Sequence, residues 1–186
     1  MKKLTEILSK WEQKNDVGHG DKNTTHSYGD VYEELLSPYR KNSNILEIGL
    51  AYGESLEVWY EYFIDSKIYG LDIQDNEIKN YLSDTRFIIN ICDATTEDCL
   101  KNYKDIKFDV IIDDASHKLE DQMMTYNLFK NNLNENGIYI IEDAIIDSNY
   151  DEIYKNLNLE KQIDIIDLRH KKNRRDDVLI VIKNKK

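Results

Sequence analysis

Two short segments of the chain combine carboxylates with an imidazole. Residues 113–117 read DDASH and residues 142–143 read ED, and each segment follows an apolar run typical of a buried strand. If the two strands are parallel neighbours, their carboxyl ends bring four carboxylates and one imidazole to a single crevice. Like charges this close are unfavourable unless a cation compensates them. Oxygen ligands select a hard divalent ion, so the pattern predicts a Mg²⁺ site.

The chemistry that such a site supports is activation of a hydroxyl group. A bound divalent ion lowers the pKa of a hydroxyl oxygen that it contacts. His117 lies at the end of the first segment, and a histidine has a reference pKa close to neutrality. We therefore expect His117 to act as the general base that takes the released proton.

A second site is indicated upstream, where an apolar run ends in an acid and two glycines. Residues 45–55 read ILEIGLAYGES, which predicts a buried strand, a tight turn and a helix. Gly49 and Gly53 permit the turn and the close approach of a ligand. Asp72 ends the next predicted strand, about 20 residues on, where ribose-binding acids lie in such units. Together the two segments predict a nucleotide-like cofactor.

The glycine spacing and Glu47 favour one cofactor over another. Ala51 stands between the glycines, whereas a dinucleotide pyrophosphate needs a central glycine there. Glu47 would also repel a diphosphate, but it would accept hydrogen bonds from an amine-bearing ligand. S-adenosylmethionine carries an ammonium and a sulfonium group. Asp72 would then bind its ribose hydroxyls, and Asp93 would lie near its adenine.

The elements that position these residues alternate regularly from residue 44 onward. Strands are predicted at 44–48, 67–72, 86–91, 108–113 and 137–142, and helices at 54–63, 76–82, 96–102 and 118–132. The central strands are nearly continuous apolar runs, as strands buried on both faces are. Residues 162–168 and 178–182, joined by a short charged turn, predict a hairpin. The expected fold class is α/β: a Rossmann-like, doubly wound, mostly parallel seven-stranded sheet with a C-terminal antiparallel hairpin.

The first 40 residues precede this pattern. The apolar stripe of Leu4, Ile7, Leu8 and Trp11 predicts a short helix, and a second helix is predicted over residues 28–36. Residues 16–27 are polar, contain glycine and predict a loop, and residues 134–137 predict a helix stop and a turn. No repeat or linker divides the chain, so we expect residues 1–186 to form a single domain.

Composition excludes several classes of function. The 186 residues carry a formal net charge of -11, which argues against nucleic-acid binding because that needs a positive surface. No apolar run reaches membrane-spanning length, and the N-terminus lacks a signal-peptide core. Cys92 and Cys99 form no CxxC pair, and we expect reduced thiols. These features predict a soluble, cytoplasmic protein without nucleic-acid or membrane partners, and they leave a homo-oligomer open.

Three motifs in strand order resemble the class I S-adenosylmethionine-dependent methyltransferases. The motifs are LEIGLAYGES, YGLDI and CDAT, and the reversed strand expected at one sheet edge also suits that family. The resemblance implies a cofactor site formed by residues of these motifs, namely Glu47, Gly49, Gly53, Ser55, Asp72, Ile73, Asp93 and Ala94.

A narrower resemblance is to the metal-dependent sugar O-methyltransferases of the macrolide-antibiotic type. Their D-D-G-S-H motif is similar to residues 113–117, with Ala115 in place of glycine, and their I-E-D motif is unchanged at residues 141–143. The resemblance implies that Asp113 faces the cofactor. It further implies metal ligands at Asp114, Glu142 and Asp143, and catalytic roles for Asp114 and His117.

Residues 21–28 resemble the opening motif of the same group, D-K-G-(S/T)-x-H-x-Y. Asn23 stands in place of the glycine. The resemblance implies a loop that covers the cofactor, with Thr25, His26 and Tyr28 near its methionine end. Residues 1–40 would then contribute the N-terminal helices and this loop.

The sequence as a whole predicts an S-adenosylmethionine-dependent O-methyltransferase. Its acceptor would be a sugar hydroxyl, on a nucleotide-sugar or a glycoside, with Mg²⁺ and His117 assisting. Two alternatives stay open: a catechol-type small-molecule O-methyltransferase, and a non-catalytic cofactor-binding scaffold domain. The basic turn at residues 169–175 is either a solvated hairpin tip or a clamp for an acidic acceptor.

Overall fold

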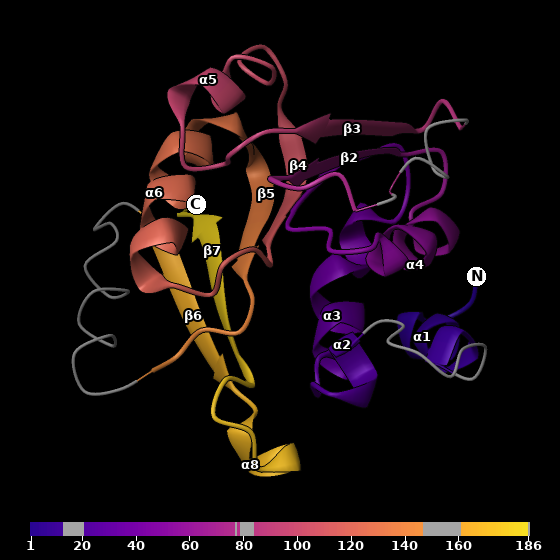
Figure 1. Ribbon diagram of the computed structural model, residues 1–186. Coiled ribbons are helices and arrows are strands. Elements are labelled where there is room, and N and C mark those ends of the chain that lie inside the picture. Colours follow the sequence, from indigo (N-terminus) through magenta and orange to yellow (C-terminus); the bar gives the residue numbers. More distant parts are fainter. Residues whose placement is uncertain (13–20, 77, 79–83, 147–160, 186) are drawn as a thin grey trace.

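A seven-stranded sheet lies at the centre of the described part of the chain (Figure 1). The computed structural model describes residues 1–12, 21–76, 78, 84–146 and 161–185. The strands are β1 (Asn44–Ile48), β2 (Lys67–Asp72), β3 (Phe87–Ile91), β4 (Phe108–Asp113), β5 (Leu133–Ile141), β6 (Lys161–Asp167) and β7 (Val178–Asn184).

The strand order is β3-β2-β1-β4-β5-β7-β6. Neighbours from β3 to β5 pair in parallel, whereas β7 runs antiparallel to both β5 and β6. The expected mostly parallel, seven-stranded sheet with a C-terminal antiparallel hairpin is therefore confirmed. The chain order reverses between β1 and β4, and open α/β sheets form their ligand crevice at such a point.

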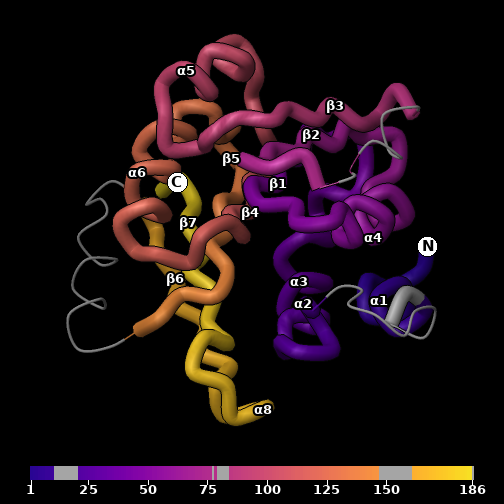
Figure 2. Tube along the Cα trace, in the orientation of Figure 1, coloured from indigo at the N-terminus to yellow at the C-terminus, as the bar shows by residue number. Residues whose placement is uncertain are grey.

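Helices cover both faces of the sheet (Figures 1 and 2). The alternation of side chains along each buried strand explains this, because Val110 and Ile112 join one apolar cluster while Ile111 joins the other. One cluster packs on α1 (Leu4–Glu12), α3 (Gly29–Leu36) and α4 (Glu54–Tyr62), and the other on α5 (Glu97–Leu100) and α6 (Leu119–Phe129).

No helix in the described ranges has the length and apolar character needed to cross a bilayer.

Three local predictions are wrong in part. Residues 21–24, expected in a loop, form the short helix α2 (Asp21–Thr24), and the expected turn after residue 168 contains α8 (Arg169–Lys172). Strand β5 begins at Leu133, so residues 134–137 lie in a strand and form no turn. Leu133 is buried and pairs with Phe108, which holds this polar stretch in the sheet. The helix expected at 76–82 falls mostly outside the described residues. Residues 16–20 of the expected loop also lie outside them.

The two cysteines are bonded to each other, so the expectation of reduced thiols is wrong for this structure. Cys92 follows β3 and Cys99 lies in α5. The Thr96 side chain caps α5 by accepting a hydrogen bond from the Cys99 backbone N–H. This turn brings the two Cα atoms to 5.5 Å, and a disulfide joins the side chains.

Candidate functional site

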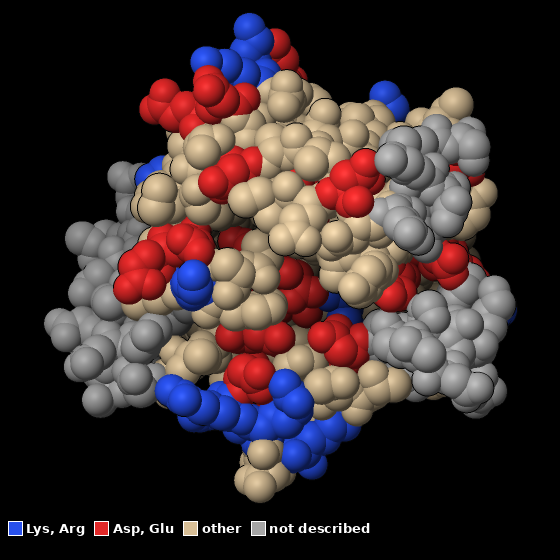
Figure 3. Space-filling model, in the orientation of Figure 1, with Lys and Arg blue, Asp and Glu red and all other residues tan. Residues whose placement is uncertain are grey.

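A cleft of about 930 Å³ opens at the carboxyl ends of the parallel strands. Its lining includes residues that follow β1, β2, β3 and β4, together with residues of the 21–28 segment. Acidic side chains gather at the centre of this face, above a band of basic side chains near α8 (Figure 3). The cleft lies where the chain order of the sheet reverses, so topology alone would select it as the ligand site.

The turn after β1 forms one wall of the cleft. Gly49 has φ +88°, and a Cβ atom on it would lie 2.2 Å from the backbone oxygen of Asp114. Gly53, at φ 85°, is the residue from which α4 begins. The glycine at position 49 is therefore required twice, for its left-handed backbone and for the close passage of the loop after β4.

Asp72 is the last residue of β2, and Asp93 lies two residues after β3. Both acids line the cleft. Asp72 Oδ2 accepts hydrogen bonds from the backbone N–H groups of Leu50 (2.7 Å) and Ala51 (3.1 Å). Asp93 Oδ1 accepts from the hydroxyl and the backbone N–H of Thr95, and these bonds lower the pKa of Asp93. Both acids thus fix the local backbone as well as facing the cleft.

Two further acids lie deeper in the sheet. Glu47 is fully buried, and its Oε2 accepts a hydrogen bond from Ser55 Oγ at 2.5 Å. Burial raises the pKa of Glu47, although Lys22 and Ser55 oppose that rise. Asp113 accepts a hydrogen bond from the Tyr139 hydroxyl at 3.2 Å, and burial raises its pKa to about 7.

The ends of β4 and β5 carry three acids that we call the acid rim: Asp114, Glu142 and Asp143. Lys22 Nζ lies 2.9 Å from Asp114 Oδ2 and 2.6 Å from Glu142 Oε1. Burial lowers the pKa of Lys22, but these carboxylates outweigh that effect and raise it well above its ordinary value. The ammonium therefore stays charged and compensates part of the negative charge of the rim.

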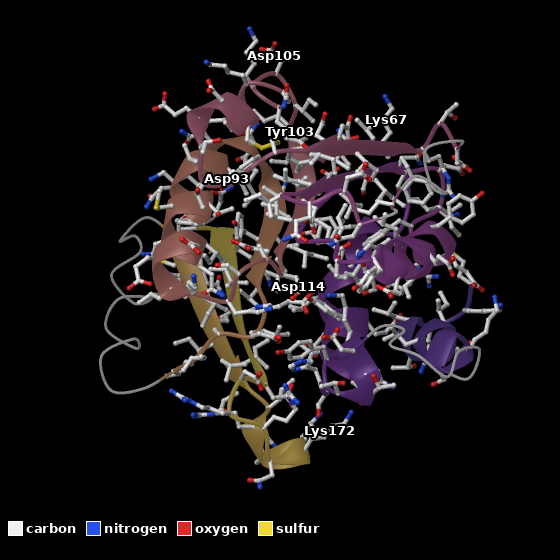
Figure 4. All side chains as sticks on the ribbon, viewed as in Figure 1. Lys67, Asp93, Tyr103, Asp105, Asp114 and Lys172 are labelled. Carbon is white, nitrogen blue, oxygen red and sulfur yellow. A yellow bond between two sulfur atoms is a disulfide. The ribbon has the colours of Figure 1, made fainter. Side chains whose placement is uncertain are left out.

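Three further partners of the acid rim also come from the N-terminal segments. The Tyr32 hydroxyl donates to Glu142 Oε1 at 2.5 Å, and the Tyr28 hydroxyl donates to Asp143 Oδ1 at 2.6 Å. His26 Nε2 lies 3.3 Å from Asp143 Oδ2. The rim is therefore assembled by side chains distant in sequence, and Figure 4 labels one of its acids, Asp114.

His117 stands at the outer edge of the rim. Its side chain is 41% exposed, and its Nδ1 lies 4.0 Å from Asp143 Oδ2. Donor atoms of Asp114, His117 and Asp143 lie within 4.8 Å of one another, a spacing that could hold a cation. A second such group consists of Asp21, His26 and Asp143.

The segment 21–28 is held in place by the turn between β6 and β7. Lys172 Nζ donates hydrogen bonds to the backbone oxygens of Asn23, Thr24 and His26, and Asp177 accepts one from the Ser27 N–H. Figure 4 labels Lys172, the last residue of α8. The basic turn is thus next to the cleft-lining segment.

Several charges of this turn already have partners. Arg169 pairs with Asp167, and Arg174 pairs with Asp176.

The two departures from the motifs are accommodated without strain, because neither Asn23 nor Ala115 has a positive φ. His117 and Asp143 do, at φ 56° and 52°.

The structure brings the predicted site residues to one region, where some line the cleft and others lie behind the residues that line it. The predicted residues that line the cleft are Thr25, Gly49, Ser55, Asp72, Ile73, Asp93, Ala94, Asp113, Asp114 and His117. The remaining predicted residues, which are not among the lining residues, are His26, Tyr28, Glu47, Gly53, Glu142 and Asp143.

Sequence reasoning assigned no role to Lys22, Tyr32 or Asp177. Lys22 stands in the 21–28 motif, which was the one available signal. A lysine in a polar segment is usually solvated, and its burial depends on contacts that local sequence does not reveal.

Comparison with known proteins identifies the family. A family model described as a methyltransferase domain matches residues 39–180. The 8-demethyl-8-alpha-L-rhamnosyl tetracenomycin-C 2'-O-methyltransferase of Streptomyces olivaceus is 31% identical over 136 residues, which cover 67% of this chain and 35% of that protein. Demethylmacrocin O-methyltransferase of Streptomyces fradiae is 30% identical over 128 residues, 63% of this chain and 32% of that protein. The chain thus spans about a third of the length of the curated relatives it matches.

Solved structures show the same fold. The MycE methyltransferase from the mycinamycin biosynthetic pathway, in complex with Mg, SAH and mycinamycin VI, superposes with a TM-score of 0.73 at 19% identity, covering 98% of this chain and 53% of that one. A protein from Staphylococcus aureus that is assigned as a caffeoyl-CoA O-methyltransferase superposes with a TM-score of 0.64 at 17% identity. The match covers 100% of this chain and 93% of that one. Fold, motifs and family model agree, and the chain belongs to the methyltransferase domain family.

Proposed function

We propose that this chain transfers the methyl group of S-adenosylmethionine to a hydroxyl of a sugar, carried on a nucleotide-sugar or a glycoside. The observation that carries the proposal is the direct contact between the cofactor turn and the acid rim. Gly49 packs so closely on Asp114 that no Cβ atom fits between them. A donor bound at the turn and an acceptor bound at the rim would therefore be neighbours.

The residues on the cofactor side suit the proposed donor. Glu47 Oε1 is a buried carboxylate oxygen that lies 3.6 Å from Lys22 Nζ. It already faces one ammonium group, and it suits the ammonium group of a methionine moiety. Asp72 Oδ1 accepts one hydrogen bond within the described part of the chain, from the Gln74 N–H, and it has a further lone pair for a ribose hydroxyl. Asp93 and Ala94 line the cleft further along, in the direction proposed for the adenine.

The acid rim suits a hard divalent ion. Its donor atoms are carboxylate oxygens, and burial raises the pKa of Glu142 and Asp143. A divalent ion would compensate the charge that burial disfavours. We propose Asp114, Glu142 and Asp143 as the residues that would hold Mg²⁺. When bound, the ion supplies positive charge that lowers the pKa of a nearby acceptor hydroxyl.

His117 is the proposed general base. Its imidazole is half-exposed at the edge of the cleft, where an acceptor hydroxyl can reach it, and Asp143 lies 4.0 Å from its Nδ1. A carboxylate at that distance stabilises the imidazolium that forms when the ring takes a proton. Asp114, between His117 and the cofactor turn, would orient the acceptor.

The Streptomyces olivaceus relative supports the acceptor class, because its name describes 2'-O-methylation of a rhamnosyl compound. We further propose that residues 1–186 act as a single domain. The contacts of Lys172 and Asp177 with residues 23–27 support this, since they join segments near the two ends of the sequence.

The test is transfer of a labelled methyl group to a panel of acceptors, with excess Mg²⁺ or with EDTA. The panel would contain deoxysugar nucleotides, macrolide glycosides and a catechol. We expect labelled sugar product in Mg²⁺ and little in EDTA. Transfer to the catechol alone would favour the catechol-type alternative. S-adenosylhomocysteine binding without transfer to any acceptor would favour the scaffold alternative and contradict the proposal.

A further inference from the structure

Lys22 occupies the middle of the acid rim. We propose that Lys22 is the resident cation of this rim, holding the Asp114 and Glu142 carboxylates until a divalent ion binds them and displaces its ammonium. The inference rests on the proposed function, because it concerns two of the residues proposed to hold Mg²⁺. It adds a positioning residue that the motifs alone do not assign.

The contacts of Lys22 resemble those of a bound cation. Its Nζ lies 2.6 Å from Glu142 Oε1, 2.9 Å from Asp114 Oδ2 and 3.6 Å from Glu47 Oε1. The residue is only 3% exposed, and the ammonium also lies 5.9 Å from the centre of the Trp59 ring. A buried ammonium surrounded by three carboxylates from the ends of different strands compensates charge that would otherwise destabilise the fold.

The oxygens that Lys22 holds are the ones a divalent ion would need. Glu142 Oε1 accepts hydrogen bonds from both Lys22 and the Tyr32 hydroxyl, which uses both of its lone pairs. Asp114 Oδ2 accepts from Lys22 as well. An ion bound by the same two carboxylates would lie close to the ammonium, and like charges at short range in a buried site repel strongly. The ion and Lys22 therefore compete for the rim.

The displaced side chain has a route to solvent. Lys22 belongs to the four-residue helix α2, and it lines the cleft together with Asp21, Thr24 and Thr25. Asp21 is exposed, so the ammonium can leave the rim for the open side of the cleft without unfolding the sheet. Metal binding would then change the wall of the cofactor cleft, which links the two halves of the site.

The first test measures Mn²⁺ binding by calorimetry to the wild type, to Lys22→Met and to the control Lys101→Met. Lys101 carries the same charge but is exposed and pairs with Asp98 on the surface. We expect Lys22→Met to bind Mn²⁺ at least about tenfold more tightly, because a competing charge is removed, and Lys101→Met to match the wild type. Equal or weaker binding by Lys22→Met would overturn the inference.

The second test needs no variant, so it holds even if Lys22→Met does not fold. Acylation of lysines in the wild type is followed by mass spectrometry in EDTA and in Mg²⁺. We expect Lys22 to be protected in EDTA and modified several-fold faster in Mg²⁺, with Lys101 unchanged. Persistent protection of Lys22 in Mg²⁺ would refute displacement. Methyl transfer by the wild type, measured separately, shows whether the proposed function stands independently of this result.

Discussion

The two sides of the cleft hold their carboxylates in different ways. On the cofactor side, these acids accept hydrogen bonds from donors at most 22 residues away: Asp93 bonds to Thr95, and Asp72 bonds to Gln74 and to Leu50 in the turn after β1. On the acid rim, Glu142 bonds to Tyr32 and Lys22, which lie 110 and 120 residues away in sequence. Asp143 likewise bonds to Tyr28 across 115 residues.

The difference separates a locally encoded site from an assembled one. The turn after β1 is held by Asp72 at the end of the adjacent strand β2, so it forms when these two strands and α4 form. The rim instead requires α2 and α3 to dock against the ends of β4 and β5, and without them its carboxylates would be buried without partners. Changes in residues 21–32 should therefore affect the rim far more than the cofactor turn.

The largest effect is expected where the two sides touch. Gly49→Ala places a Cβ atom 2.2 Å from the Asp114 backbone oxygen and puts an alanine at φ +88°. We expect a loss of about 3 kcal/mol in the free energy of unfolding, measured by urea denaturation, from strain and overpacking together. Ala51→Gly is the matched control, because Ala51 already has a positive φ of 48° and glycine relieves it. A well-tolerated Gly49→Ala would contradict the close contact.

His117→Ala tests the chemistry of the rim without changing the cofactor side. We expect turnover of the sugar acceptor to fall by about a hundredfold, which is the contribution of a general base. The affinity for S-adenosylhomocysteine, measured by calorimetry, should stay within about twofold of the wild type, as expected for a site that is independent of His117. The exposed His170, on α8, provides the control variant His170→Ala. Equal loss of turnover and cofactor affinity in His117→Ala would show that the two sides do not act separately.

Tyr32→Phe tests how strongly the rim depends on α3. The change removes the hydroxyl that donates to Glu142 Oε1 and leaves a buried carboxylate with one donor fewer. We expect a loss of about 2 kcal/mol in the free energy of unfolding, measured in EDTA. Tyr126→Phe is the control, because its buried hydroxyl has no hydrogen-bond partner among the described residues. We expect that variant to be as stable as the wild type, and equal losses in both would show that the Glu142 contact adds nothing.

The fold and the cofactor turn could be predicted from the sequence because their signals are local. Apolar runs placed the strands, and the positive φ of Gly49 and Gly53 agrees with the role expected of glycine there. The start of β5 was missed because Asn134, Glu135 and Asn136 are typical turn residues. In the structure, Asn184 Nδ2 donates to the backbone oxygens of Asn134 and Glu135, a contact across 50 and 49 residues.

The rim could be predicted only in part for the same physical reason. Its acids follow predicted strands, so their gathering at one edge of the sheet follows from topology. The partners that make them stable do not. The polar sequence around Lys22 carries no sign of burial, and the apolar stripe that contains Tyr32 does not show which acid its hydroxyl contacts. Cys92 and Cys99 were also misjudged, since the turn that brings them to 5.5 Å depends on the cap of α5 by Thr96.

The smallest effect should be confined to the cofactor side. Asp72→Asn keeps one oxygen for the Leu50 and Ala51 N–H groups but loses the charge and an acceptor for a ribose hydroxyl. We expect S-adenosylhomocysteine to bind about tenfold more weakly by calorimetry, equivalent to about 1.4 kcal/mol, with Mn²⁺ affinity unchanged. Asp105→Asn, exposed and far from Asp114 in Figure 4, controls for net charge. Among the described residues, the Asp72 carboxylate accepts hydrogen bonds from the turn after β1 and from residue 74. A parallel loss of Mn²⁺ affinity would therefore mean that the turn transmits strain through Gly49 to Asp114, and the locally encoded site would then be part of the assembled one.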